Sequence, residues 1–203
     1  MGGVGLLPPR FGRSGVQPPP GRPMSPGRLR PARPAPPAGA PVLRGRWQDV
    51  PVLHVIFFEP RIPGNTGAAI RLSANTGSML HLVDPLFDME DSKLRRAGLD
   101  YHDLANTRVH AAWEDCLTHI PGRIFAFTAQ ASRLYTDVDW RDDDALLFGP
   151  EPSGLPEEIM AHCRVADRIR IPMVEGNRSL NLANSAAVGL YEAWRALGFP
   201  GAR

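Results

Sequence analysis

Val52-Leu-His-Val-Ile-Phe-Phe58 decides the fold of this chain. The run is short, apolar and rich in β-branched and aromatic residues, which is typical of a strand buried on both faces of a sheet. Residues 59–67, Glu-Pro-Arg-Ile-Pro-Gly-Asn-Thr-Gly, follow at once. Their two prolines and two glycines predict a fixed loop that leads into a helix. A buried strand, a loop and a helix in this order indicate one unit of a parallel α/β sheet.

The same alternation continues along the chain. We expect further strands at residues 79–83, 107–111, 123–128, 145–149 and 168–171, and helices at 67–75, 91–97, 113–119, 156–162 and 180–197. Gly77 is expected to close the first helix, because glycine favours the left-handed conformation that ends helices. The predicted fold class is α/β, a parallel sheet covered by helices on both faces.

The composition changes near residue 47. Residues 1–46 hold 12 of the 22 prolines, nine of the 20 glycines and eight arginines, with no Asp, Glu or Lys. The rest of the chain therefore holds 15 of the 23 basic residues and all 21 acidic residues, a net charge of −6. A general basic coat for nucleic acid is excluded for this body, so any RNA contact there must be a local patch.

A segment this rich in proline and glycine cannot build a packed core. We therefore predict an extension over residues 1–48 and one folded domain over 49–203. Three interpretations of the extension stay open: a disordered segment or a start codon assigned too far upstream, an arginine-rich transit peptide, and a basic arm that contacts RNA phosphates.

Several kinds of protein are disfavoured by what the sequence lacks. Two cysteines outside any CxxC make no disulfide framework and no four-cysteine zinc site. The histidines show no zinc-ligand spacing with the cysteines, and the Asp142–Asp144 run is expected to be a solvated loop. There is no apolar run of about 18 residues, no secretory signal, no GxGxxG after a strand and no GxxxxGK[ST]. A cytoplasmic protein without a classical dinucleotide site or P-loop is expected.

Ligands of parallel sheets bind beyond the carboxyl ends of the strands, and three strand exits carry unusual loops. At the first exit Asn65 or Thr66 is expected to cap the helix, with Arg71 near the helix N-terminus, where an anion or a ribose would bind. At the second exit Glu151 stands in a rigid loop of three prolines and two glycines, at residues 148–156.

The third exit carries Ser179, Asn181 and Asn184 at the start of the last predicted helix. Capping accounts for Ser179 but not for both asparagines. Asn181 and Asn184 are three residues apart and share a helix face, which suits recognition of a polar ligand.

Four ordered motifs carry a family resemblance. They are Asn65-Thr-Gly67 with Arg71 and Asn75-Thr-Gly77; Leu94-Arg-Arg-Ala-Gly-Leu-Asp-Tyr-His102; Phe148-Gly-Pro-Glu with Gly154-Leu-Pro156; and Ile169-Arg-Ile-Pro-Met173 with Ser179-Leu-Asn-Leu182. Over residues 53–201 the chain resembles the SPOUT superfamily of RNA 2'-O-methyltransferases, and within it the tRNA (cytidine(34)-2'-O)-methyltransferase subfamily.

The resemblance implies an α/β sheet whose C-terminal part is tied in a deep trefoil knot, which is rare among folds. It implies a homodimer that binds S-adenosyl-L-methionine and methylates the ribose 2'-hydroxyl of wobble nucleotide 34 in the tRNA anticodon loop, with no metal and no membrane. Alternatives are a SPOUT enzyme for ribosomal RNA or another tRNA position, and a non-catalytic RNA-binding protein that keeps the knot. A generic α/β metabolic enzyme is a further alternative.

The resemblance also assigns residues. It implies a catalytic set of Asn65, Arg71, Glu151, Ser179, Asn181 and Tyr191; a cofactor set of Phe127, Gly149, Ile171, Ser179 and Asn181; and an RNA-binding set of Lys93, Arg95, Arg96 and Arg178. Relatives often have Thr-Lys after the strand at 125–128 and Thr-Arg where Pro152-Ser153 stands here. A basic contact of the first loop is therefore expected to be lost or moved to Arg133.

Overall fold

A seven-stranded sheet forms the centre of the computed structural model, which describes residues 53–88 and 106–202. The strands are β1 (His54–Phe58), β2 (Met79–Val83), β3 (Thr107–His110), β4 (Ile124–Phe127), β5 (Arg133–Leu134), β6 (Ala145–Phe148) and β7 (Val165–Arg170). They lie in the order β3-β2-β1-β6-β4-β7-β5, and every neighbouring pair is parallel. The predictions for residues 1–48, for the helix at 91–97 and for the motif at 94–102 lie outside the described residues.

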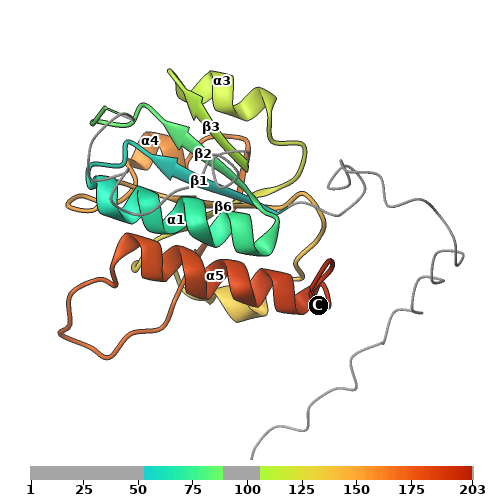
Figure 1. The fold of residues 1–203 in the computed structure, drawn as a ribbon. Coiled ribbons are helices and arrows are strands. Elements are labelled where there is room, and N and C mark those ends of the chain that lie inside the picture. The colour runs from blue at the N-terminus through green and yellow to red at the C-terminus, as the bar shows by residue number, and fades with distance from the viewer. Residues whose placement is uncertain (1–52, 89–105, 203) are drawn as a thin grey trace, which may run out of the picture. The chain divides into compact units, whose positions relative to one another are not determined.

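The helices are α1 (Pro63–Thr76), α3 (Trp113–Thr118), α4 (Glu157–Met160) and α5 (Leu182–Ala196), with a 3-10 turn η2 at Tyr135–Asp137. Helices α1 and α5 lie side by side on one face of the sheet, and α3 and α4 lie on the other (Figure 1).

Alternate strand residues supply two cores. Val55 and Phe57 of β1 pack with the α1 and α5 side, whereas Ile56 and Phe58 pack with the α3 and α4 side. Because successive side chains of a strand point to opposite faces, a strand covered on both faces must be apolar throughout. The predicted parallel α/β sheet with both faces covered is confirmed.

Helix α1 begins four residues earlier than predicted. Pro63 occupies its first position, where a missing N–H costs nothing, so Asn65 and Thr66 lie inside the first turn and cannot be its N-cap. The N-cap is Ile62, which has no capping side chain. The other end agrees with the sequence: Gly77 has φ 73° and donates its N–H to the carbonyl oxygen of Ser73.

Two further expectations differ from the structure. Helix α5 begins at Leu182, and its N-cap is Asn181 rather than Ser179. Asp144 is not solvated: it is 1% exposed, and its carboxylate lies 2.6 Å from the Arg123 guanidinium and accepts the Arg141 N–H at 2.8 Å. A carboxylate this buried requires such partners, and the spacing of the acidic run could not reveal them.

Within residues 53–88 and 106–202, no helix is both long and apolar enough to cross a lipid bilayer.

Candidate functional site

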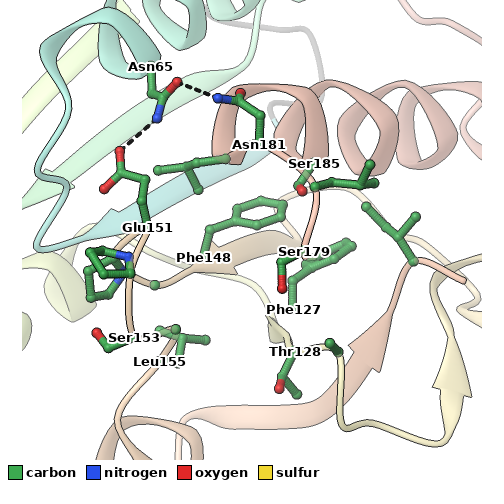
Figure 2. A pocket seen from close by; sticks show the side chains of 18 of the residues that line it. Asn65, Phe127, Thr128, Phe148, Glu151, Ser153, Leu155, Ser179, Asn181 and Ser185 are labelled. Carbon is green, nitrogen blue, oxygen red and sulfur yellow. Dashed lines mark hydrogen bonds between the residues drawn. The ribbon is translucent and has the colours of Figure 1, made fainter. Parts of the chain in front are cut away.

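A cavity of about 450 Å³ opens at the carboxyl ends of the central strands. It lies where the loops after β1, β4, β6 and β7 meet, so segments far apart in the sequence share one wall (Figure 2). Its lining consists of Ile62, Asn65, residues 127–130, residues 148–155, Ile171, Met173, residues 179–182 and Ser185. The volume is within the usual range of about 300–1,000 Å³ for small-molecule sites.

A chain of hydrogen bonds joins the three predicted exits. The Asn181 amide Nδ2 donates to Asn65 Oδ1 at 2.9 Å, and Asn65 Nδ2 donates to Glu151 Oε1 at 2.8 Å (Figure 2). At the far end, the backbone N–H of Asn184 donates to Asn181 Oδ1 at 3.2 Å. One row of side chains therefore ties the first exit to the other two.

The order of donors and acceptors along these hydrogen bonds determines how the side-chain amides of Asn65 and Asn181 are oriented. Glu151 at one end offers only acceptors when ionised, so Asn65 must turn its NH₂ toward it. The backbone N–H of Asn184 at the other end is a donor, so Asn181 must turn its oxygen toward it. The two remaining groups, Asn65 Oδ1 and Asn181 Nδ2, then face each other as acceptor and donor.

Glu151 also holds the entry to α1. Its carboxylate accepts the backbone N–H groups of Arg61 at 3.0 Å and Ile62 at 3.3 Å, in addition to the Asn65 amide. A carboxylate at a helix N-terminus is stabilised by the helix dipole, usually by about 0.3–1 kcal/mol. Glu151 thus fixes the two residues that precede α1 and the Asn65 side chain in its first turn.

The loop that carries Glu151 is held by its own backbone. A Cβ added to Gly149 would stand 2.3 Å from the backbone nitrogen of Leu155 and 2.5 Å from the carbonyl carbon of Gly154. Only glycine permits this approach, and Gly154 itself has φ +71°, which favours glycine again. The loop therefore closes on itself and presents Glu151 in a fixed position.

Stacked aromatic rings form the apolar floor of the cavity. The rings of Phe127 and Phe148 lie 4.5 Å apart at an interplanar angle of 22°. Helix α5 presses on Phe127 at Gly189, where an added Cβ would stand 2.8 Å from the ring. The hydroxyl-bearing residues Thr128, Ser179 and Ser185 lie around this floor (Figure 2). A flat apolar surface with polar groups at its edge suits a planar heterocycle.

The structure places the predicted site residues in three groups. Asn65, Phe127, Gly149, Glu151, Ile171, Ser179 and Asn181 line the cavity. Arg71, Arg178 and Tyr191 are exposed and stand outside its lining; Tyr191 packs edge-on against Trp194, with ring centroids 5.6 Å apart. Lys93, Arg95 and Arg96 lie outside the described residues. Arg71 is also farther from the helix N-terminus than expected, because α1 begins at Pro63.

Sequence reasoning missed several lining residues. Gln130 lies in a loop whose spacing carries no motif, and Ser185 belongs to the first turn of α5. Met173 ends one of the four family motifs but was not predicted as part of the site. Phe148 belongs to one of the four family motifs, and its place in the cavity was not predicted. The expected shift of a basic contact to Arg133 has a structural competitor, because that guanidinium pairs with Asp167 at 2.7 Å and bonds the carbonyl oxygen of Asp137.

The fold and the cavity together define a class: a parallel α/β protein with a cofactor-sized cleft formed by loops at the carboxyl ends of its strands. The chain belongs to the SpoU rRNA Methylase family, whose model matches residues 52–191. The family resemblance seen in the sequence is confirmed.

Three similar proteins illustrate the relationship. The tRNA (cytidine(34)-2'-O)-methyltransferase of Methylovorus glucosotrophus (strain SIP3-4) is 52% identical over 153 residues, which are 74% of this chain and 99% of that protein. A solved structure that concerns the 2-OH methylation of C/U34 on tRNA is 42% identical, with a TM-score of 0.67, over 72% of this chain and 97% of that one. An AdoMet-bound rRNA methyltransferase from Sinorhizobium meliloti is 27% identical, with a TM-score of 0.65, over 73% of this chain and 58% of its own.

Proposed function

We propose that this chain transfers the methyl group of S-adenosyl-L-methionine to the ribose 2'-hydroxyl of nucleotide 34 of tRNA, a cytidine or a modified uridine. The observation that carries the proposal is the Glu151–Asn65–Asn181 chain, which gathers three loops around one cleft. The similarity to a wobble methyltransferase over 99% of that protein's length supports the same substrate.

Ribosomal RNA is the alternative substrate, and it is disfavoured by sequence similarity. The chain is 52% identical to the tRNA (cytidine(34)-2'-O)-methyltransferase and 27% identical to the rRNA methyltransferase. A tRNA substrate also implies the cytoplasm as the compartment.

The residues of the cavity fit the cofactor. The stacked Phe127 and Phe148 and the side chain of Ile171 offer an apolar surface for adenine, and the polar rim at Thr128 and Ser179 offers hydrogen-bonding groups to the rest of the molecule. When bound, the cofactor supplies an electrophilic methyl on its sulfonium, so the transfer needs no metal.

The chain's own residues would position the ribose. We assign to Asn65, Glu151 and Asn181 the task of holding the cleft in one geometry, because positioning of the reacting atoms can supply much of the rate. Arg71 stands outside the cavity, which suits contact with RNA rather than with the cofactor. A guanidinium stays protonated in proteins and is a poor base, so Arg71 would fix a phosphate and stabilise negative charge developing on the 2'-oxygen. Phosphate or water would take the proton.

We propose a homodimer whose chains each carry a C-terminal trefoil knot. Val188 and Tyr191 of α5 are 39% and 47% exposed, a surface that a second copy could cover. Arg71, Arg178 and Tyr191 lie outside the cavity lining. They would therefore act at a site that a second copy of the chain or the RNA completes. The loops at 149–156 and 171–181 both line the cleft, and α5 then packs on α1. The knot would form in this part of the chain, from residue 149 to α5.

Residues 49–203 would form the catalytic domain and residues 1–48 an extension. A fragment comprising residues 49–203 is then expected to keep methyl transfer to tRNA.

Ribose-methylation mapping of total tRNA from a strain that lacks the gene tests the proposal. Methylation at nucleotide 34 is expected to disappear and to return with the wild-type gene but not with Arg71→Ala. An unchanged wobble position, with loss of methylation elsewhere in tRNA or ribosomal RNA, would refute it.

A further inference from the structure

Three buried imidazoles form a hydrogen-bonded row on the α3 side of the sheet, apart from the cavity. His54 Nδ1 lies 3.0 Å from His81 Nε2, and His81 Nδ1 lies 2.9 Å from His110 Nε2. At the outer end of the row, His110 Nδ1 lies 2.8 Å from Asp115 Oδ2. These histidines do not line the cavity, and the proposed methyl transfer uses none of them.

A fourth histidine, His119, lies beside the outer end of this row. His119 follows the last turn of α3, four residues after Asp115, so both side chains belong to one side of the helix. The ring centroids of His110 and His119 are 5.0 Å apart. One ligand atom each from His110, Asp115 and His119 lie within 4.8 Å of one another.

We propose that His110, Asp115 and His119 bind one divalent transition-metal ion of the Zn²⁺ class. Two imidazoles and one carboxylate form a donor set that binds Zn²⁺ and Co²⁺, and a water molecule would complete a tetrahedron. The ion would tie the end of β3 to α3. This metal site is independent of the proposed methyl transfer.

The ligand atoms must move before they can hold an ion, because atoms that are now up to 4.8 Å apart must approach by up to about 1.5 Å. Bonds of about 2.0–2.1 Å to nitrogen and oxygen place neighbouring ligand atoms of a tetrahedron roughly 3.3 Å apart. The His110–Asp115 contact of 2.8 Å must therefore open by about half an ångström. Asp115 can make this movement, because its side chain is 53% exposed.

The buried row supplies the hydrogen-bond acceptor that a metal-binding histidine needs at its other ring nitrogen. When Nδ1 of His110 faces an ion, the proton must reside on Nε2, and an acceptor for that N–H is required. His81 Nδ1 stands at 2.9 Å to accept it, and His81 can in turn donate from Nε2 to His54. Each neutral imidazole has one donor and one acceptor, so the row can carry its protons in either direction. With the ion bound, the row runs from His110 toward His54.

A competing position for the ion lies deeper. Cys116 is buried, and its sulfur lies within 4.8 Å of ligand atoms of His81 and His110. An ion there would have to separate His81 from His110 and displace the proton of a buried thiol. The outer set keeps the row intact and uses an exposed carboxylate, so we assign the ion to the outer set.

Zn²⁺ titration of the tag-free, full-length, chelator-treated chain tests the site by calorimetry. One Zn²⁺ per chain is expected, with a rise of the thermal unfolding midpoint as Zn²⁺ is added. His119→Gln and Asp115→Asn should each weaken Zn²⁺ binding by at least about tenfold, the lower end of what even the loss of an outer partner costs. His162→Gln, at a half-buried histidine outside the cluster, is the matched control and should bind as the wild type does. Circular dichroism checks that each variant is folded.

Co²⁺ then identifies the ligands by absorption. Visible bands of a tetrahedral site without a thiolate charge-transfer band are expected. The proposal is overturned if no saturable one-to-one binding of Zn²⁺ is found, or if His119→Gln and Asp115→Asn bind as the wild type does. A thiolate band would overturn the assigned ligand set in favour of Cys116.

Discussion

Asn181 donates a hydrogen bond of 2.9 Å to Asn65, although the two residues are 116 positions apart in the sequence. The bond joins the N-cap of α5 to the first turn of α1, and Asn65 passes the connection on to Glu151. A change at either asparagine therefore acts on two other loops, which makes the account testable by substitution.

Asn181→Ser separates the two tasks of Asn181. Serine keeps an oxygen that can cap α5, but its side chain is too short to reach Asn65. We expect the free energy of unfolding to fall by about 0.5–1.5 kcal/mol, the usual net value of one hydrogen bond, while S-adenosyl-L-methionine affinity and methyl transfer both fall. Calorimetry and a tritium transfer assay measure the two losses.

Asn184→Ala is the matched control for Asn181→Ser. Asn184 donates its backbone N–H to Asn181 Oδ1, and alanine keeps that backbone group. The control should bind S-adenosyl-L-methionine as the wild type does. Unchanged binding in Asn181→Ser as well would contradict the role of the amide chain.

Arg71→Ala should abolish methyl transfer and leave cofactor binding nearly intact. Cofactor binding should survive because Arg71 lies outside the cavity lining, on an exposed part of α1. Single-turnover transfer to tRNA is expected to fall by at least about 100-fold, the scale of removing one stabilising charge in a transition state. A large loss of cofactor affinity in calorimetry would show that Arg71 serves the cofactor instead.

Gly149→Ala should damage the cleft from within. The new Cβ would meet the backbone of Gly154 and Leu155, which cannot move aside as a flexible side chain can. We expect a loss of about 1–3 kcal/mol in stability and weaker binding of S-adenosyl-L-methionine.

Gly64→Ala provides the comparison for Gly149→Ala, since a Cβ at Gly64 would have no neighbour within 4 Å and the residue lies in the first turn of α1. Urea denaturation should show it to be neutral or stabilised by up to about 1 kcal/mol. Equal stability of both variants would argue against a tight loop at Gly149.

The buried imidazoles predict a loss of stability in acid. Burial lowers the pKa of His54 to about 4 and that of His81 to about 2, whereas both titrate near 6.5 in the unfolded chain. Below about pH 6.5 these two imidazoles bind protons in the unfolded chain but not in the folded chain. The unfolding free energy therefore falls as the pH drops from about 6.5 toward 4. At pH 5 each imidazole should cost about 2 kcal/mol at most.

Urea denaturation at pH 7 and pH 5, with a chelator present, measures this loss. His54→Gln should reduce the difference between the two pH values, because it removes one of the two titrating groups. A His54→Gln variant with the same pH dependence as the wild type would mean that other groups cause the loss.

The strands and the three exits could be predicted because their causes are local. Buried strands are apolar over their whole length, as in β1 and β6, and glycine and proline mark the loops after them. These rules placed Asn65, Glu151 and Asn181 at strand exits, and the convergence of exits at one edge of a parallel sheet brought them together.

The remainder depends on contacts distant in sequence. The start of α1 is held by Glu151, about 90 positions away, so local capping rules assigned it to the wrong residues. The burial of Asp144 depends on Arg123, and the imidazole row depends on three neighbouring strands. Pattern and spacing within one segment cannot reveal such partners.

The most direct measurement uses two tRNA transcripts that differ in one atom. The purified chain is incubated with S-adenosyl-L-methionine carrying a trideuterated methyl group, and with tRNA that has either cytidine or 2'-deoxycytidine at position 34. Mass spectrometry of nuclease fragments should find the labelled methyl on the ribose of nucleotide 34 in the first transcript and on no nucleotide of the second. A labelled methyl at another nucleotide, or equal labelling of both transcripts, would contradict the account.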